Sequence, residues 1–350
     1  MNLICGALIV NAIVKWFFMK IAIVKLSALG DIVHGMIVLQ FIKKYYPESK
    51  IDWFVEKRFR GILESNPHIH EICQLNLKSI KESKSLFLLL KELRKIHKFG
   101  KYDLVIDMQN LLKSAVISRV IPSDKTIGLD RNSAREGIAS IFYNQMFTID
   151  HSSNVILRNT TIVAKALNIK ILQTDIKNKK PFLYSSKKYT INAISNKKQN
   201  IVLVPGASYP SKCYPVKNFS ELSTQIDANF LVIWGSEKEK VLANEIKDLS
   251  PDVHVCEKLS LDGLISIISQ VDLVIGPDSG PTHMAWALNI PSITLFGPTP
   301  GYRNTYSTDI NKIIESESEV NPYKIDKNDY SIKNINSIDI VKMSKYLLKD

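Results

Sequence analysis

Residues 272–288 are DLVIGPDSGPTHMAWAL: an apolar run, then a turn of small residues, then a second apolar run. This order is typical of a buried strand that enters a helix through a glycine-rich turn. Three further apolar runs end in similar turns, namely NIVLVPG at 200–206, FLVIWG at 230–235 and SITLFGP at 292–298. We expect helices between these strands, over 218–227, 238–249 and 261–270. The alternation predicts an α/β fold built on a parallel sheet.

The first half of the chain shows the same alternation. The apolar run KIAIVKL at 20–26 precedes the turn SALGD at 27–31 and a long amphipathic stretch at 32–46 that predicts one helix. Further strands are predicted at 50–56 and 102–108, and an amphipathic helix around 86–97.

A chain of 350 residues has about twice the usual domain length, so two domains are expected. The two successive alternations predict two Rossmann-like domains that face each other across a central cleft. The predicted boundaries are an extension at 1–18, a first domain at 19–170, a linker at 171–198, a second domain at 199–333 and a closing C-terminal helix at 334–350.

The first 18 residues are expected to lie outside this fold. LICGALIVNAIV is apolar but too short to span a bilayer comfortably, and it lacks the basic start and cleavage site of a secretory signal. Met19 directly precedes the first predicted strand, so we expect natural translation to begin there. A short anchor on a membrane surface is the alternative.

Charge is distributed unevenly along the chain. Residues 1–175 hold 25 basic and 15 acidic residues, a net +10, while 176–350 hold 21 and 19, a net +2. An anionic partner of the first half is one interpretation, and a merely soluble Lys-rich surface is the other. The sequence lacks the spacing of basic and aromatic residues that marks nucleic-acid binders, so no nucleic-acid partner is expected. Four scattered cysteines favour a reduced, cytoplasmic setting.

Ligands of open α/β sheets bind beyond the carboxyl ends of the strands, so the turns carry the candidate chemistry. Residues 276–283 place backbone N–H groups at the start of a helix, where a diphosphate fits. Ser279 and Thr282 add hydroxyl donors, and Asp278 suits sugar hydroxyls. The alternatives are that Asp278 only caps the turn and that His283 is only a buried, hydrogen-bonded histidine.

Two other turns of the second half follow predicted strands. Ser208 and Lys212 offer a hydroxyl and an ammonium to the same diphosphate, and Glu237 offers a carboxylate to ribose hydroxyls. Taken singly, residues such as Lys212 and Glu237 are more often solvated surface charges, but their joint placement after parallel strands favours a binding role. In the first half, Gly30 permits close backbone approach and Asp31 lies at the start of a helix, where a simple capping role is the alternative.

Several familiar motifs are absent from the sequence. There is no G-x-G-x-x-G, which argues against a nicotinamide-dependent dehydrogenase, and no P-loop or G-x-S-x-G. No two aspartates are separated by one residue, so the D-x-D pair that holds a divalent metal on a nucleotide diphosphate is missing. We therefore expect Lys212 and helix-end amides to meet the charge of a leaving diphosphate without a metal.

Five ordered motifs resemble the ADP-heptose:LPS heptosyltransferases, a family of GT-B glycosyltransferases. They are KLSALGDIVHG at 25–35, DMQNLLKSA at 107–115, SAREGIASIFYNQ at 133–145, GPDSGPTHMAWAL at 276–288 and LFGPT at 295–299. The resemblance spans Met19 to roughly Pro300. The form S-A-L-G-D with a later SARE resembles the type I enzymes more than the type II enzymes, whose turn usually has S-W-V-G-D.

The resemblance implies inverting transfer of L-glycero-D-manno-heptose from ADP-heptose to the first Kdo of Kdo2-lipid A, at the inner face of the cytoplasmic membrane and with no cofactor. Asp31 would be the general base. On the donor side, Asp278 would contact the heptose, Glu237 the ribose, and the backbone near Leu259 the adenine. The diphosphate would be bound by Ser208, Lys212, Ser279 and Gly280, with Thr282 and His283 beside them. Ser208 stands where the family has Thr, and Ala207 where many relatives have a second Thr.

The implied acceptor carries phosphates and carboxylates, for which arginine is well suited. The candidate acceptor-binding residues are Ser27, Gly30, Arg58, Arg60, Lys113, Arg131 and Arg135, and solvated surface arginines are the alternative. Two other functions stay open at this point. One is a related GT-B transferase such as a type II heptosyltransferase, and the other is a noncatalytic sugar-nucleotide-binding protein.

Overall fold

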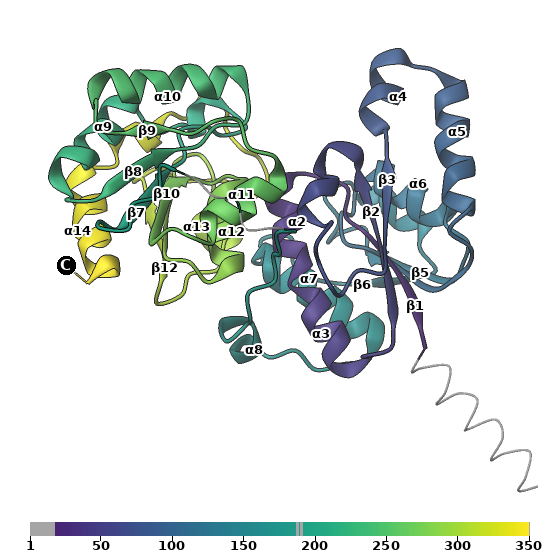
Figure 1. The fold of residues 1–350 in the computed structure, drawn as a ribbon. Helices are drawn as coiled ribbons and strands as arrows, with labels where there is room; N and C mark the ends of the chain where they lie inside the picture. Colours follow the sequence, from purple (N-terminus) through teal and green to yellow (C-terminus); the bar gives the residue numbers. More distant parts are fainter. Residues whose placement is uncertain (1–17, 187–188, 190–191, 350) are drawn as a thin grey trace, which may run out of the picture. The chain divides into compact units, whose positions relative to one another are not determined.

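The computed structural model describes residues 18–186, 189 and 192–349, and the predicted extension at 1–18 lies outside this part except for Phe18. The chain divides into two compact units (Figure 1). The first comprises residues up to 153 together with 157–178, and the second comprises 154–156 and the chain from Lys179 onward. The division between Asn178 and Lys179 falls inside the segment that the sequence predicts as a linker.

Unit 1 is a six-stranded parallel sheet with the order β3-β2-β1-β4-β5-β6. This is the doubly wound Rossmann order, in which the winding direction reverses between β1 and β4. The strands are β1 Lys20–Val24, β2 Lys50–Glu56, β3 Glu71–Leu75, β4 Tyr102–Asp107, β5 Ser123–Leu129 and β6 Gln145–Phe147. The helices are α2 Leu29–Met36, α3 Val38–Tyr45, η1 Lys57–Ile62, α4 Leu77–Ser83, α5 Leu86–His97, α6 Leu112–Val120, η2 Gly137–Phe142, α7 Val155–Leu167 and α8 Gln173–Lys177.

The amphipathic stretch at 32–46 forms two helices, so the prediction of one helix is wrong. Ile37 keeps helical dihedral angles, but its N–H bonds to the carbonyl of Gly35, which interrupts the regular ladder. Gly35 packs tightly there, since an added Cβ would lie 3.2 Å from Met108 Cε. The sequence also gave no signal for β3, because its residues Glu71 and Gln74 break the apolar pattern of a strand.

Unit 2 repeats the architecture with the order β12-β11-β10-β7-β8-β9, and its winding reverses between β7 and β10. The two predicted parallel sheets are thus confirmed. The strands are β7 Asn200–Leu203, β8 Asn229–Val232, β9 His254–Val255, β10 Leu273–Pro277, β11 Ser292–Phe296 and β12 Asn311–Glu315. The helices are η3 Pro210–Lys212, α9 Val216–Gln225, α10 Glu237–Leu249, α11 Leu261–Ile268, α12 Gly280–Leu288, α13 Gly301–Asn304, η4 Ser331–Asn334 and α14 Ser337–Leu348.

The C-terminal helix α14 belongs to the core of unit 2. Ile340, Val341 and Leu348 pack with side chains of β7, β10 and β11 in one buried apolar cluster. Burial of aliphatic side chains of this size contributes about 1.5–3 kcal/mol each, so α14 stabilises the sheet that carries the second candidate site. Within the described part of the chain, no helix combines the length and the apolar character needed to cross a bilayer.

Gly276 on β10 lies against the neighbouring strand-end residue Val204, and it provides a test of this packing. An added Cβ would lie 2.6 Å from Val204 Cβ and 2.9 Å from its carbonyl oxygen. We expect Gly276→Ala to cost about 1–3 kcal/mol of unfolding free energy and to lower the Tm by several degrees. The matched control is Gly263→Ala in α11, where the nearest atoms would be 3.5 Å away. Equal melting of both variants in calorimetry would contradict the packing.

Candidate active site

The predicted site residues follow neighbouring strands at the carboxyl edge of each sheet. In unit 1, Asp31 follows β1, Lys113 follows β4, and the arginines follow β2 and β5, so these segments leave four adjacent strands. In unit 2, Lys212 follows β7, Glu237 follows β8, Leu259 follows β9 and Asp278 follows β10, again four adjacent strands. Each set therefore surrounds the point where the winding of its sheet reverses, the place where such sheets bind ligands.

Asp31 is the third residue of α2, and its carboxylate is half-buried. Its Oδ2 atom accepts a hydrogen bond from the backbone N–H of Ala28, the N-cap, at 3.2 Å. This contact is the capping role that the sequence left open, and it fixes the rotamer of the side chain. Because it uses only one of the two carboxylate oxygens, the capping role leaves room for Asp31 to accept a proton at the other.

The 107–115 motif supports the turn that carries Asp31. Gln109 Oε1 accepts hydrogen bonds from the backbone N–H groups of Leu26 and Ser27, each at 3.1 Å. Lys113 Nζ donates to Ser27 Oγ at 3.3 Å. The two motifs thus meet at the β1–β4 reversal, which brings Ser27 and Lys113 together as candidate binding groups. Gly30, the second residue of α2, lies half-buried in the same turn.

The four candidate arginines differ in how their charges are compensated. Arg58 Nε lies 3.3 Å from Glu56 Oε1, and Arg60 Nε lies 2.7 Å from Glu64 Oε1. Arg131 and Arg135 are exposed, and within the described residues neither guanidinium has an ionic partner. The second pair is therefore better placed to receive an anionic ligand, whereas the first pair would have to exchange or share a carboxylate.

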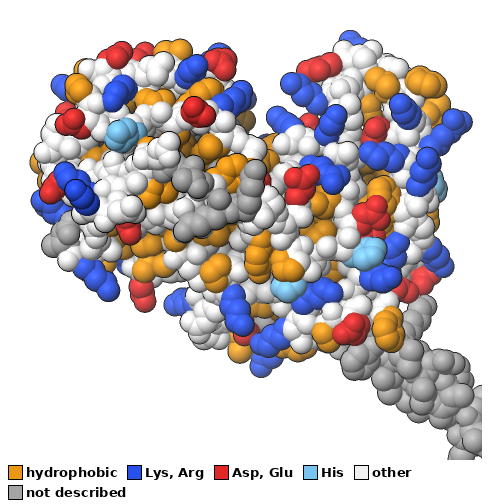
Figure 2. All heavy atoms as spheres, in the orientation of Figure 1, with side chains coloured by type: hydrophobic (Ala, Val, Ile, Leu, Met, Phe, Trp, Pro, Cys, Tyr) orange, Lys and Arg blue, Asp and Glu red, His pale blue; other side chains and the backbone are white. Residues whose placement is uncertain are grey.

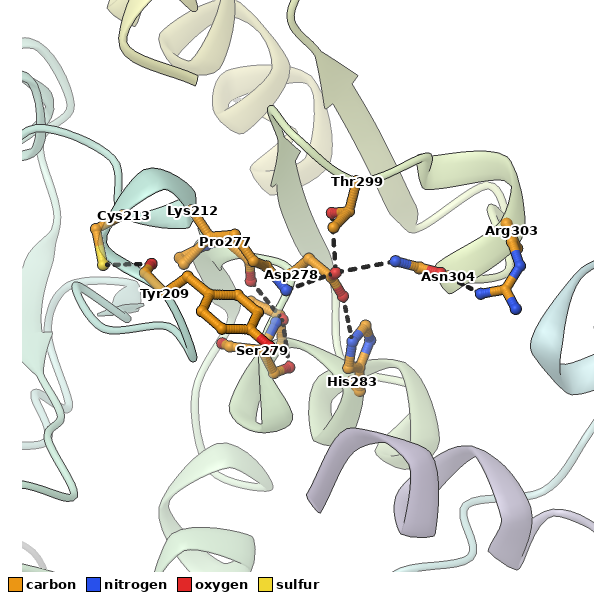
Figure 3. A network of polar contacts seen from close by, with 11 residues as sticks. Tyr209, Lys212, Cys213, Pro277, Asp278, Ser279, His283, Thr299, Arg303 and Asn304 are labelled. Atoms are coloured by element: carbon orange, nitrogen blue, oxygen red, sulfur yellow. Dashed lines mark hydrogen bonds and ion pairs between the residues drawn. The ribbon is translucent and has the colours of Figure 1, made fainter. Parts of the chain in front are cut away.

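Asp278 is the centre of a buried polar network in unit 2 (Figure 3). Its Oδ2 atom lies 2.7 Å from Lys212 Nζ and also accepts hydrogen bonds from Thr299 Oγ1 at 3.0 Å and Asn304 Nδ2 at 3.1 Å. Its Oδ1 atom lies 2.9 Å from His283 Nε2. Four side chains thus converge on a single carboxylate: Lys212 from the end of η3, Thr299 from the loop after β11, His283 from α12 and Asn304 from the end of α13.

Burial by itself raises the pKa of Asp278, but the neighbouring Lys212 ammonium and the hydrogen bond with His283 outweigh it and hold this pKa well below its usual range. The carboxylate is therefore ionised at neutral pH. The structure pairs the two groups that the sequence assigned separately to heptose and diphosphate. An ammonium has three N–H donors, so Lys212 keeps donors beyond the one that faces Asp278.

Ser279 combines burial with an unused hydroxyl at the start of α12. It is the N-cap residue, yet its side chain makes no capping hydrogen bond, and its Oγ atom is buried without a partner among the described residues. Buried hydroxyls are normally hydrogen-bonded, so this one is suited to a ligand atom. Gly280 begins the helix. The Thr282 hydroxyl already has partners within the protein, because its Oγ1 lies 2.9 and 2.8 Å from the carbonyl oxygens of Pro277 and Ser279, which share its one hydrogen.

The remaining donor-side candidates lie on loops of unit 2. Ser208 is exposed after β7, and Leu259 is half-buried just before α11. Glu237, the first residue of α10, is exposed and has no side-chain partner among the described residues. Glu239 instead accepts from the N–H groups of Gly235 and Ser236 at 2.7 and 3.0 Å. The capping role thus falls to Glu239 and leaves the Glu237 carboxylate available.

Sequence reasoning missed Thr299 and Asn304 as members of the Asp278 network. Thr299 had a signal, because it ends the LFGPT motif directly after β11. Asn304 lies at the end of the short helix α13, and no motif marks it.

One group of side chains in the described residues has the spacing of a metal site: Asp52, His70 and Glu71. Asp52 is fully buried there and already contacts His70 Nδ1 at 2.9 Å and the Tyr102 hydroxyl at 2.7 Å. These contacts satisfy both carboxylate oxygens, so the group has a structural explanation. It lies on β2, at the start of β3 and on the residue just before β3, and it shares no residue with the predicted site.

Comparison with known proteins gives consistent matches. A family model described as glycosyltransferase family 9 (heptosyltransferase) matches residues 89–329. Lipopolysaccharide heptosyltransferase 1 of Campylobacter coli is 40% identical over 348 residues, which cover 95% of this chain and 100% of that protein. These matches confirm the predicted resemblance to the type I heptosyltransferases.

Solved structures show the same architecture. A glycosyltransferase family 9 protein from Veillonella parvula has a TM-score of 0.80 at 18% identity, covering 95% of this chain and 97% of that chain. E. coli heptosyltransferase WaaC with ADP-2-deoxy-2-fluoro heptose has a TM-score of 0.75 at 22% identity, covering 94% and 99%. The predicted GT-B fold class is thus confirmed.

The Asp278 network predicts a pH-dependent contribution to stability. Asp278→Asn leaves Lys212 buried without its counter-ion, so at pH 7 we expect a loss of roughly 3 kcal/mol and a lower Tm. Because the folded-state pKa of Asp278 is depressed, its contribution is complete above about pH 4 and is lost as the pH falls further. The Tm difference from wild type should therefore stay constant above about pH 4 and shrink as the pH falls below that value.

The matched control is Asp309→Asn, which removes an exposed carboxylate of the same unit. Its Tm should follow wild type at every pH in scanning calorimetry. A Tm difference for Asp278→Asn that stayed constant with pH would refute the assignment of the effect to the ionised carboxylate.

Proposed function

Because this chain belongs to glycosyltransferase family 9, the heptosyltransferases, we propose that it transfers L-glycero-D-manno-heptose from ADP-heptose to the first Kdo residue of Kdo2-lipid A, with inversion at the anomeric carbon. The acceptor hydroxyl forms a bond to that carbon while the bond from the carbon to the diphosphate breaks. The proton of the hydroxyl goes to Asp31, and ADP leaves. No metal takes part in this proposal.

The observation that carries the proposal is that the two reversal points, β1–β4 in unit 1 and β7–β10 in unit 2, hold different polar groups. Unit 1 has a carboxylate held by its own helix N-cap, as a general base requires, with Lys113 in the first turn of α6, the helix that follows the adjoining strand β4. Unit 2 has an unused buried hydroxyl on Ser279 beside the Lys212–Asp278 pair. The first arrangement suits proton abstraction and the second suits a sugar diphosphate.

The donor is supported by the chemistry of unit 2. The diphosphate would accept hydrogen bonds from the α12 N-terminus, from Ser279 and from the remaining donors of Lys212, which together offset its developing charge. Asp278 would orient Lys212 and contact the heptose, and Glu237 would bind the ribose. The E. coli relative whose structure holds ADP-2-deoxy-2-fluoro heptose is consistent with this donor class.

The acceptor is supported by the basic residues of unit 1. Arg131 and Arg135, with no ionic partner of their own among the described residues, suit the carboxylates and phosphates of Kdo2-lipid A. Such an acceptor lies in a membrane, so we place the enzyme at the cytoplasmic face of the inner membrane as a peripheral protein. Incubation with ADP-heptose and Kdo2-lipid A, followed by mass spectrometry of the lipid, tests the reaction. A lipid that gains no heptose would reject it.

Asp31→Asn tests the general base. The amide still accepts the Ala28 N–H but takes no proton, so turnover should fall by roughly 10²- to 10⁴-fold. Binding of ADP-heptose, measured by calorimetry, should stay unchanged because the donor groups lie on unit 2. Undiminished turnover would overturn the role of Asp31, and a parallel loss of donor binding would show that the substitution acts through the fold.

Arg131→Gln combined with Arg135→Gln tests the acceptor site. Removal of two charge-assisted hydrogen bonds should raise the KM for Kdo2-lipid A by about tenfold or more, while the KM for ADP-heptose stays constant. The matched control is Arg119→Gln, an exposed arginine near the end of α6. If the control raises the acceptor KM equally, bulk charge rather than these two residues is responsible.

A further inference from the structure

Helix α5 exposes large apolar side chains that its own unit does not cover. Leu86, Phe87 and Leu90 are 68%, 73% and 46% exposed. Their spacing of three and four residues puts them on one face of the first turns of the helix. Ser85 caps this end, since its Oγ atom accepts the Leu88 N–H at 3.3 Å. The apolar face is therefore part of a well-formed helix.

The second half of α5 fixes the helix to unit 1. Ile96 is buried in a core cluster, and Leu93 packs against the same cluster. Lys95 Nζ donates to the Gln74 carbonyl at 2.6 Å. Ile96 lies nine residues after Phe87 and therefore on the opposite side of the helix, so the buried side of α5 faces away from Phe87.

Basic side chains continue the same outward face. Lys91, Arg94 and Lys98 follow Phe87 and Leu90 at spacings of three and four residues, and all three are exposed. Residues 77–98, which form the α4–α5 hairpin, contain seven Lys and Arg and two Glu, a net charge of +5. In Figure 2, orange apolar and blue basic side chains lie next to one another over α4 and α5. Apolar residues flanked by Lys and Arg are typical of helices that lie in a membrane interface.

Helix α10 provides an internal comparison. It also exposes apolar side chains, Val241 and Leu249, each 56% exposed. Its sequence EKEKVLANEIKDL, however, carries three Lys against four acidic residues. Exposed apolar residues alone therefore do not distinguish α5, but their combination with a strong positive charge does.

The hairpin lies at the same edge of the unit 1 sheet as the candidate acceptor-binding residues. Helix α4 begins two residues after β3 ends, so the hairpin leaves the sheet at its carboxyl edge. The segments that carry Asp31, Lys113 and the arginines leave the neighbouring strands β2, β1, β4 and β5 at that same edge. A surface bound by the hairpin would thus lie on the side of unit 1 that holds the acceptor candidates.

We propose that the α4–α5 hairpin is the membrane-docking element of this protein, with Leu86, Phe87 and Leu90 entering the interface of an anionic bilayer and Lys91, Arg94 and Lys98 contacting its phosphate groups. Docking at this edge presents a lipid-linked acceptor to unit 1 and removes the need to extract it. The choice of acceptor rests on the proposed function, whereas the docking rests on the hairpin alone.

Vesicle flotation of the full chain tests the docking. Vesicles with about 30% phosphatidylglycerol in phosphatidylethanolamine should bind the wild type, while phosphatidylcholine vesicles should not. Phe87→Ser with Leu90→Ser should reduce binding about tenfold or more, because little apolar area remains to enter the interface. Lys91→Gln, Arg94→Gln and Lys98→Gln together should do the same and should reduce the salt sensitivity of the remaining binding.

Two control variants match these changes in unit 2. Val241→Ser with Leu249→Ser removes the exposed apolar pair of α10, and Lys217→Gln, Lys238→Gln and Lys342→Gln removes three exposed lysines. Both should bind vesicles like the wild type. Hairpin variants that keep their Tm and still bind like the wild type would overturn the proposal, since another segment then carries the binding. Equal binding to neutral vesicles, or hairpin-dependent dimerisation in sedimentation, would also overturn it.

Activity separates this proposal from the proposed function. Hairpin variants should lose transfer to Kdo2-lipid A in vesicles and keep transfer to a water-soluble, deacylated Kdo acceptor. Asp31→Asn should lose transfer to both acceptors and still bind vesicles. If no variant or wild type transfers heptose, the proposed function fails while the flotation result stands. If hairpin variants lose transfer to the soluble acceptor as well, the hairpin acts on catalysis and the docking role is rejected.

Discussion

The reversal of winding between two adjacent parallel strands is the constraint on which both candidate sites depend. At β1 and β4, and again at β7 and β10, the chain leaves neighbouring strands in opposite directions, so the loops that follow separate and leave room at the sheet edge. Helix N-termini point into that room with unpaired backbone N–H groups. Polar residues placed in these turns therefore meet across the reversal, as Ser27 and Lys113 do in unit 1 and Lys212 and Asp278 in unit 2.

The carboxylates at the two reversal points, Asp31 and Asp278, have different electrostatic surroundings. In unit 1, the Asp31 carboxylate is half-buried and is restrained by one backbone N–H, which leaves it open to a hydroxyl proton. In unit 2, the Asp278 carboxylate is buried and contacted by four side chains, three at Oδ2 and one at Oδ1, so its charge mainly orients these side chains. A carboxylate so fully bound is a poor base, because protonation would break its contacts. The geometry thus separates the proton-accepting role from the positioning role.

The sequence predicted the strands that are apolar runs ending in glycine or aspartate, because such runs are local patterns, and it missed the strands without this pattern, namely β3, β5, β6, β9 and β12. It did not predict which turn residues would meet. Lys212 and Asp278 lie 66 positions apart, and their pairing depends on β7 and β10 becoming neighbours. The same limit explains why Asn304 was missed, since nothing in its local sequence marks a side chain that reaches across to β10. The break at Ile37 was missed for another reason: its helical dihedral angles preserve the apolar pattern while one hydrogen bond changes partner.

Much of the positive charge of residues 1–175 lies in one structural element, the α4–α5 hairpin. Of its net +10, half belongs to the 22 residues of the α4–α5 hairpin. Lysines spread over the whole surface would keep the protein as soluble as lysines concentrated on one hairpin, and solubility does not require apolar side chains beside them. Concentrating them on one outward helix face next to Phe87 and Leu90 instead carries a cost, because exposed apolar area invites aggregation. Such a cost is explained when the face has a partner that is both apolar and anionic, and a phospholipid surface is the partner that combines these two properties.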